Sequence, residues 1–334
     1  MLFEGRLGGN VYRPIGMEWA EKGFWRLADH PATRAQFLSM EQGYRPVDGS
    51  PALNVGEYKE GVHYCQDIDS GKYNKALTFD EFMATDIDLI IATIPQHVES
   101  FYLLSQLHPK KPKVIYQIGN NWNIPTTSPI KNVMASARLT HKPEGFNIVE
   151  YHQEFDTSIF KPDYHQTATK NIFSFVNCFN VDQLFAADWS LFQQVEAKMP
   201  DWTFRSFGGQ CRDGAAHGSQ DLANKMNESR FIWHTKQGGD GYGHVLHNAF
   251  AVGKPVIINR GYYDNKMGAD LLVDGVTAIF IDSLNPDQIV EKIANCNNGM
   301  QYASMCGCVR EKFRQVVNFD AEFEQIKLFL GKLL

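Results

Sequence analysis

The sequence has little that would place the chain in a membrane, in a disulfide-rich class or on nucleic acid. No apolar run approaches the roughly 18 to 20 residues that span a bilayer, and no basic segment followed by an apolar one stands at the start. The six cysteines show no paired spacing of a zinc site, which favours reduced thiols. A net charge of −6 disfavours bulk capture of nucleic acid, although a basic cleft on an acidic body stays open. These absences predict a cytoplasmic protein without a membrane span.

The composition is that of an ordinary globular protein, with 43% hydrophobic and 21% charged residues. A chain of 334 residues is long for one hydrophobic core, so two domains are expected. Strand and helix patterns alternate along the chain, which predicts α/β domains with parallel sheets. We expect a first domain over 1–162, a second domain over 163–318 and a terminal helix over 319–334.

Within the first domain, residues 1–4 predict a very short opening strand. Gly8 and Gly9 then lead into a helix with Pro14 near its first turn. Residues 43–75 are rich in glycine and proline and support no assignment of elements. A buried strand, a helix and a second strand are expected after that, over 88–95, 98–107 and 113–118.

The second domain repeats the alternation. Its expected strands cover 171–176, 202–207 and 231–235, and its expected helices cover 182–198 and 221–229.

A glycine-rich loop over 237–243 then opens onto a helix over 244–252. Gly253 ends this helix, and a short buried strand begins at Pro255. Glycines let a backbone pass close to a ligand because no Cβ stands in the way. A glycine loop at a helix N-terminus presents free N–H groups and the positive end of the helix dipole, and both suit a phosphate. Without further evidence, an ordinary loop-helix-strand unit explains the segment equally well.

Four stretches are similar, in order and spacing, to retaining GT-B glycosyltransferases of the family 4 type. They span nearly the whole chain: Leu7-Gly8-Gly9-Asn10-Val11, Phe155 to Pro162, Asp240-Gly241-Tyr242-Gly243 with the Pro255-Val256-Ile257 strand, and Gly268 to Asp282. The resemblance implies a GT-B fold, in which two Rossmann-like domains face each other across a cleft. It also implies that the terminal helix crosses back to the first domain.

The resemblance further implies a role for each residue of the loop. A nucleotide-sugar donor would bind against the second domain, where Asp240 would hydrogen-bond hydroxyls of the transferred sugar. The amides around Gly241, Tyr242, Gly243 and His244 would hold the diphosphate leaving group, whose charge develops in the transition state. The Tyr242 ring itself is expected to pack in the core. Gly8 and Gly9 of the first domain would also be donor-binding residues.

Two departures from the family pattern affect the donor site. Asn248 stands where the family has a glutamate that binds both ribose hydroxyls. An amide there should weaken ribose binding by roughly 1 kcal/mol, about a factor of five, because hydrogen bonds to charged acceptors are stronger. The family also carries an Arg and a Lys for the diphosphate near residues 178–182, where this chain has no basic residue. The nearest basic residues in the sequence are Arg205, Lys236 and Arg260, of which Lys236 is the best-placed substitute.

Three residues of the first domain are candidates for the reacting centre. His97 follows the strand over 88–95 and is a candidate catalytic group. Asn120 and Asn121 follow the next strand, where many family members have a histidine, and are acceptor-side candidates. No side-chain base is required in a retaining enzyme of this type if the departing phosphate accepts the acceptor's proton.

Two Asp-x-Asp triplets could suggest a metal site, one at Asp67 and Asp69 and one at Asp86 and Asp88. Neither follows a strand, as a metal site at the carboxyl end of a sheet would require. We therefore predict no metal, and no cofactor other than the nucleotide sugar as co-substrate, with a UDP-sugar as the expected donor.

The predicted function is transfer of a sugar from this donor to an unidentified acceptor, with retention. Two alternatives stay open. Compact GT-B enzymes of phages act on hydroxymethylated bases in DNA, although the acidic net charge counts against nucleic acid as the acceptor. A catalytically silent relative that binds only a nucleotide or sugar would also explain Asn248 and the missing Arg and Lys.

Overall fold

The structure is a computed structural model that describes residues 2–14, 55–59, 62–66, 73–93, 98–119, 124, 128–164 and 170–334. Three sheets are present in this part of the chain, two in the first domain and one in the second. Two of them are entirely parallel, with the orders β5-β6-β7-β8 and β10-β9-β11-β12-β13. The predicted class, an α/β chain with two Rossmann-like domains, is confirmed.

The first domain carries a second four-stranded sheet, which is mixed and has the order β1-β4-β3-β2. Its elements are η1 (Leu2–Arg6), β1 (Arg13–Pro14), β2 (Val55–Lys59), β3 (Val62–Gln66), β4 (Tyr73–Leu77), α3 (Phe79–Ala84), β5 (Leu89–Ala92), α4 (Val98–Leu107), β6 (Lys113–Ile118), β7 (Asn132–Ala135) and β8 (Asn147–Glu150).

The second domain contains one five-stranded sheet with helices on both faces. Its elements, with the helix that follows them, are β9 (Asn171–Ser174), η3 (Gln183–Phe185), α5 (Ala186–Lys198), β10 (Thr203–Ser206), α6 (Gly218–Glu228), β11 (Phe231–Trp233), α7 (His244–Ala251), β12 (Val256–Ile258), η4 (Arg260–Tyr263), η5 (Met267–Leu271), β13 (Ala278–Phe280), α8 (Pro286–Cys296), α9 (Gly299–Val316) and α10 (Phe319–Gly331).

The predicted opening strand is wrong. Residues 2–6 form a single π-helical turn, η1, which is closed by a hydrogen bond from Leu7 N to Leu2 O of 3.0 Å. Leu2, Phe3 and Leu7 pack against the apolar cluster under α10. Packing against this helix therefore takes the place of pairing in a sheet.

The predicted helix at Pro14 is also wrong at its start. Arg13 and Pro14 form the short strand β1, which pairs in parallel with β4 at the edge of the mixed sheet. Proline has no N–H to donate, and an edge strand tolerates this because one side has no partner strand. The rest of that predicted helix lies outside the described residues.

The region that the sequence left unassigned contains β2, β3 and β4. These strands pair antiparallel, with a register shift between Val55 and Glu57. The patterns further along the chain predicted the elements well. In the first domain α4 and β6 have the predicted bounds, and in the second domain the strands β9 to β12 lie within or close to their predicted ranges.

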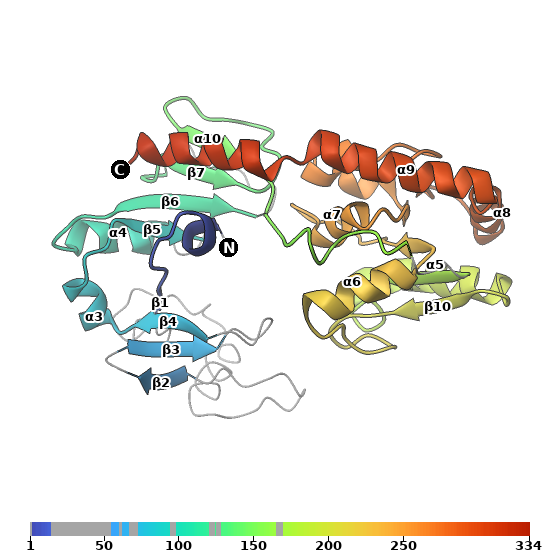
Figure 1. Cartoon of the computed structure of the whole chain (residues 1–334), viewed down its shortest axis with the longest axis horizontal. Helices are drawn as coiled ribbons and strands as arrows, with labels where there is room; N and C mark the ends of the chain where they lie inside the picture. Colours follow the sequence, from blue (N-terminus) through green and yellow to red (C-terminus); the bar gives the residue numbers. More distant parts are fainter. Residues whose placement is uncertain are drawn as a thin grey trace.

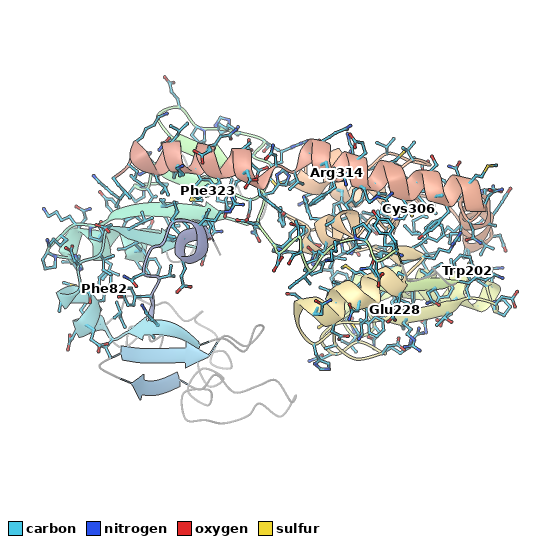
Figure 2. The ribbon with its side chains drawn as sticks, viewed as in Figure 1. Phe82, Trp202, Glu228, Cys306, Arg314 and Phe323 are labelled. Atoms are coloured by element: carbon cyan, nitrogen blue, oxygen red, sulfur yellow. The ribbon has the colours of Figure 1, made fainter. Side chains whose placement is uncertain are left out.

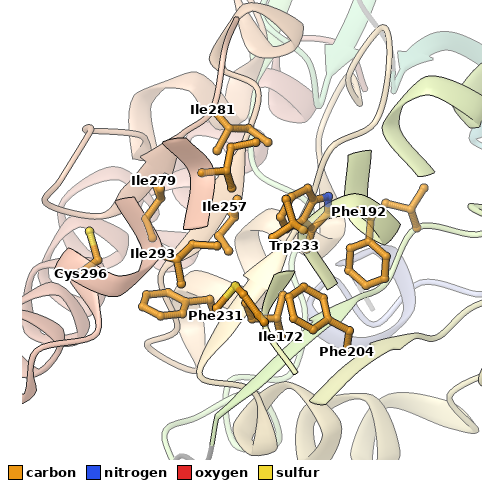
Figure 3. Close-up of a cluster of buried hydrophobic side chains, with 14 of the residues drawn as sticks. Ile172, Phe192, Phe204, Phe231, Trp233, Ile257, Ile279, Ile281, Ile293 and Cys296 are labelled. Carbon is orange, nitrogen blue, oxygen red and sulfur yellow. The ribbon is translucent and has the colours of Figure 1, made fainter. Parts of the chain in front are cut away.

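Alternating residues of β11 supply the two cores of the second domain. Phe231 and Trp233 face the helices α5 and α8, whereas Ile232 faces α7. Figure 3 shows Trp233 between Ile257 of β12 and Phe192 of α5, and Phe231 near Ile293 of α8. Burying a side chain of this size contributes about 1.5–3 kcal/mol to the free energy of unfolding. The closely packed sheet therefore supports the loops at its carboxyl edge.

The helices α9 and α10 follow one another along one side of the molecule, α9 over the second domain and α10 over the first (Figure 1). Cys306 and Arg314 lie on α9, and Phe323 lies on α10 (Figure 2). Ile326, Phe329 and Leu330 of α10 pack on the first-domain face formed by β6, β7 and β8. Among the described residues, no helix is both long and apolar enough to cross a bilayer.

Lys254 lies between α7 and β12 and is buried, with 7% of its surface exposed. Burial lowers the pKa of Lys254 from 10.5 to about 8 because the ammonium group loses its water. Between pH 8 and pH 10.5 Lys254 is protonated in the unfolded chain but not in the folded one, so the free energy of unfolding rises with pH in this range. Below pH 8 Lys254 is protonated in both states, and the destabilisation by its buried charge is constant. Lys254→Met should therefore stabilise the fold at pH 7 by on the order of 2 kcal/mol, and this gain should shrink toward pH 10.5.

Urea unfolding at pH 7 and pH 10 measures this difference. Lys198→Met is the control, because that side chain is largely exposed and only pairs with Asp287 at 2.7 Å. A loss of stability in Lys254→Met that is the same at both pH values would contradict the expectation.

Candidate functional site

The glycine-rich loop joins β11 to α7 at the carboxyl edge of the second sheet. Gly239 N donates to Lys236 O at 2.8 Å, which closes a tight turn. Gly238, Gly239 and Gly243 have φ values of 81°, 64° and 83°, in the left-handed region that favours glycine. A Cβ on Gly239 would lie 2.1 Å from the carbonyl oxygen of Tyr262, so the loop packs directly on the backbone of η4.

The N-terminus of α7 has no side-chain cap. Gly243 is its N-cap residue, and the first amide bonded within the helix is His247 N, which donates to Gly243 O at 3.0 Å. No acceptor in the described part of the chain binds the amides of His244, Val245 and Leu246. Three free N–H groups and the positive end of the helix dipole therefore meet at one place, which is the geometry of an anion site.

Asp240 lies beside this helix end with two basic side chains. Lys236 Nζ forms an ion pair with Oδ1 of Asp240. The ring of His234 is buried, and its Nε2 lies 3.4 Å from Oδ2 of Asp240 without hydrogen-bond geometry. Burial opposes the charge of Asp240, but His234 and Lys236 outweigh it and hold the pKa of this carboxyl well below its usual range. Asp240 is therefore ionised and can only accept hydrogen bonds.

Asn248 lies in the middle of α7 and is 6% exposed. Its amide oxygen has no hydrogen-bond donor in the described part of the structure. A buried polar atom without a partner is rare in folded proteins, so this oxygen is a candidate acceptor of a hydrogen bond.

The rings of Tyr242 and His247 stack on each other and fix the end of the loop where α7 begins. Their rings stack with centroids 4.1 Å apart and an interplanar angle of 7°. His247 Nδ1 lies 2.9 Å from Gly243 O, and full burial lowers the pKa of His247 to about 3, so this ring is neutral. Tyr242 is buried, as the sequence led us to expect of its ring, and its hydroxyl donates to Gln153 O at 3.0 Å.

This last bond joins the loop to the segment that leaves the first domain. Gln153 Nε2 donates to Ser136 Oγ at 2.5 Å, and a Cβ on Gly119, at the carboxyl end of β6, would lie 3.9 Å from Gln153 Nε2. The glycine loop therefore points toward the carboxyl edge of the first domain's parallel sheet.

Of two further contacts, one joins α10 to the first domain and the other joins the first domain to the second. His152 binds Glu322 of α10 through both its backbone N and its Nδ1, each at 2.7 Å. Arg138, which follows β7, forms an ion pair with Asp270 of η5.

The other predicted site residues either form no hydrogen bond with this cluster in the described part of the chain or cannot be placed. Gly8 and Gly9 follow η1, and Gly9 N donates to Phe3 O at 2.9 Å. Arg205 is exposed on the edge strand β10, and β9 separates it from β11. Three predicted residues lie outside the described residues: His97, Asn120 and Asn121.

The triplets that suggested a metal are only partly described. Asp67 and Asp69 lie outside the described residues, and Asp86 lies 3.5 Å from Lys110 Nζ in an exposed ion pair.

Sequence reasoning missed three residues of the cluster: Asp188, His234 and His247. Asp188 and His234 belong to no motif, and His247 lies within the predicted helix over 244–252. His247 lies three residues, slightly less than one turn, after His244 on α7, so helical spacing was the signal that could have placed the two on one side of the helix.

No protein-family model matches this sequence, and no curated protein is similar to it in sequence. Solved structures are similar in fold. HepE of Anabaena, in complex with UDP and glucose, shares 14% identity with a TM-score of 0.59, over 77% of this chain and 81% of that one. Sucrose-phosphate synthase of Thermosynechococcus elongatus shares 12% identity with a TM-score of 0.58, over 77% and 76%. A glycosyltransferase of Rickettsia africae shares 12% identity with a TM-score of 0.57, over 75% and 78%.

At these identities the similarity concerns the fold. The α/β chain with its two parallel sheets superposes on GT-B glycosyltransferases over about three quarters of its length, so this chain has the GT-B fold.

Proposed function

We propose that this protein transfers a sugar from a nucleotide-diphosphate sugar, with a UDP-sugar as the favoured donor, to an acceptor hydroxyl with retention. The observation that carries the proposal is the uncapped first turn of α7 beside the pair formed by Lys236 and Asp240. This group of residues lies on the loop that Tyr242 joins to the first domain. Residues 163–318 would bind the donor, and residues 1–162 would bind the acceptor.

The diphosphate would lie on the amides of His244, Val245 and Leu246. Lys236 would supply the positive charge that the family pattern places near residues 178–182, and it would move from Asp240 to the phosphate when the donor binds. Fixed donors aimed at a charge that develops in the transition state are usually the largest single contribution to catalysis.

The sugar and the ribose would be held on either side of the diphosphate. Asp240 is ionised, so it would accept hydrogen bonds from sugar hydroxyls. The unpartnered oxygen of Asn248 would accept one hydrogen bond from a ribose hydroxyl.

In the proposed reaction the bond from the anomeric carbon to the diphosphate oxygen breaks, and the acceptor oxygen bonds to the same face of that carbon. The acceptor's proton passes to the departing phosphate oxygen, so no side-chain base is required. His97, Asn120 and Asn121 stay candidates for contacts to the acceptor and the reacting sugar.

Two of the solved structures with this fold support the choice of donor by what they contain. HepE was crystallised with UDP and glucose, and the pneumococcal O-GlcNAc transferase GtfA with UDP and GlcNAc.

The test is a screen of the purified protein against UDP-, GDP- and ADP-sugars, in which release of the nucleotide and binding by calorimetry are both measured. We expect slow hydrolysis of one UDP-sugar without an acceptor, because water can replace the acceptor hydroxyl. Faster release on adding hydroxymethylated DNA would identify that acceptor.

The screen also separates the enzyme from the silent relative, which Asn248 and the missing basic pair favour. Binding of UDP without turnover of any donor would support the silent relative. If the protein neither binds nor turns over any nucleotide sugar, both the enzyme and the silent relative are refuted.

A further inference from the structure

Asp188 is a buried carboxylate whose hydrogen bonds leave its own helix. It lies in the first turn of α5 and is 5% exposed. Its Oδ2 accepts from Gln237 N at 3.0 Å, and its Oδ1 accepts from the hydroxyl of Tyr262 at 3.2 Å. The residues that follow β9, β11 and β12 therefore meet at this one side chain.

An acidic residue in a first helical turn commonly needs no explanation beyond the helix dipole. Asp188 differs from that case in two respects. Burial raises its pKa, and no cation in the described part of the chain forms an ion pair with it. Burying a carboxyl group without a nearby cation costs free energy, because the group loses its water. The hydrogen bonds from Gln237 and Tyr262 offset part of this cost, which a residue that acts only on the helix dipole would not require.

The bond to Gln237 acts on the two charged residues of the candidate site. Gln237 is the second residue of the turn that Gly239 N closes on Lys236 O. Fixing Gln237 N thus fixes the backbone on which Lys236 and Asp240 stand. Tyr262 completes the arrangement, because its hydroxyl binds Asp188 and its carbonyl oxygen contacts Gly239 from the other side.

We propose that Asp188 is a positioning residue of the donor site: with Tyr262 it fixes the turn from Lys236 to Gly239 and so orients Lys236 and Asp240 toward the donor. The statement about the donor rests on the proposed function, whereas the statement about the turn does not. Asp188 touches neither the donor nor the reacting atoms and acts through Gln237.

Three variants separate the hydrogen bonds of Asp188 from its charge. Asp188→Ala removes both bonds. Asp188→Asn keeps them without the charge, because its carbonyl accepts from Gln237 N and its NH₂ group donates to the Tyr262 hydroxyl, which can rotate. Tyr262→Phe removes only the second bond. Asp287→Ala is the matched control, because Asp287 also lies in a first helical turn, that of α8, but is exposed and far in sequence from the loop.

Hydrogen exchange of residues 236–243 in the free protein tests the turn without any ligand. Exchange should be about tenfold or more faster in Asp188→Ala, and within about threefold of the parent in Asp188→Asn and Asp287→Ala. Tyr262→Phe should fall between these values. Parent-like exchange in Asp188→Ala would overturn the proposal, and so would equal acceleration in Asp188→Asn, because the charge and not the bonds would then matter.

Donor kinetics test the consequence. Asp188→Ala should raise the donor KM about tenfold with a smaller change in kcat, and Asp188→Asn should restore KM to within about threefold. A donor KM in Asp188→Ala equal to that of the parent would refute the link from the turn to the donor.

The two proposals fail in different ways. If the parent protein neither binds nor turns over a donor, the proposed function fails, and the exchange measurement still decides the role of Asp188. If Asp188→Ala does not fold, Tyr262→Phe decides instead, and exchange equal to that of the parent in this variant would overturn the proposal.

Discussion

Replacing Gly239 by alanine should weaken donor binding by more than about 100-fold, whereas the same change at Gly238 should weaken it by less than about tenfold. Both glycines have a left-handed backbone, so each alanine variant carries the same intrinsic strain of about 1–2 kcal/mol. The two differ in their surroundings: a Cβ on Gly239 would lie 2.1 Å from Tyr262 O, whereas among the described residues, adjacent ones in the chain aside, no heavy atom lies within 4 Å of a Cβ on Gly238.

A carbon and a carbonyl oxygen normally approach no closer than about 3.3 Å, so the backbone around Gly239 must move by roughly 1 Å. Because the turn carries Lys236 and Asp240, both charged groups would move with it. A displacement of this size can reduce the rate about 100-fold when it affects groups that contact a substrate.

Calorimetric titration with UDP and with the donor measures the two affinities, and thermal unfolding shows whether each variant is folded. Gly238→Ala serves as the control for left-handed strain. Equal losses of affinity in the two variants would show that strain, and not the contact with Tyr262, limits this position.

Replacing Asp240 by alanine should lower kcat/KM for the donor by about 100-fold, because a hydrogen bond to a charged acceptor contributes about 1.5–3 kcal/mol. Asp240→Asn should lose less, about tenfold, since an amide oxygen still accepts one bond. The low pKa of Asp240 also gives a pH expectation. Protonation of this residue should not reduce activity between pH 7 and pH 5, because the carboxyl stays ionised well below its usual range.

The matched control is Asp264→Ala. Asp264 forms the same kind of pair as Asp240, with a basic residue four positions earlier, since its Oδ1 lies 2.6 Å from Arg260 Nη1. It is exposed and lies outside the loop, so its loss should leave kcat/KM unchanged. Full activity in Asp240→Ala, with unfolding equal to that of the parent, would remove Asp240 from the site.

The pair of Lys236 and Asp240 also explains how the site could work without the basic residues that the family pattern has near 178–182. In the free protein Lys236 pairs with Asp240, and this pairing would keep the carboxylate from repelling a donor at the proposed diphosphate site. When Lys236 exchanges Asp240 for a phosphate, its ammonium group is paired with an anion before and after the change. This exchange costs less free energy than burying an unpaired ammonium group.

Local sequence patterns predicted most of the second domain. The unbroken apolar stretch at Phe231, the glycine loop and the helix at His244 depend on neighbours within a few residues, and the structure confirms each of them. The N-terminal segment was predicted less well. Leu2 and Phe3 are compatible with a strand or a turn, and contact with α10, more than 300 residues away in sequence, selects the turn.

The candidate site divides in the same way. The sequence by itself determined the fold class and the glycine loop with its helix, because the backbone preferences of glycine and the spacing of apolar residues are local properties. The tertiary structure alone decided that Asp188, His234 and Tyr262 surround this loop and that Tyr242 joins it to Gln153. These contacts link residues up to 89 positions apart, and their formation depends on how the ends of parallel strands meet, which no stretch of sequence encodes alone.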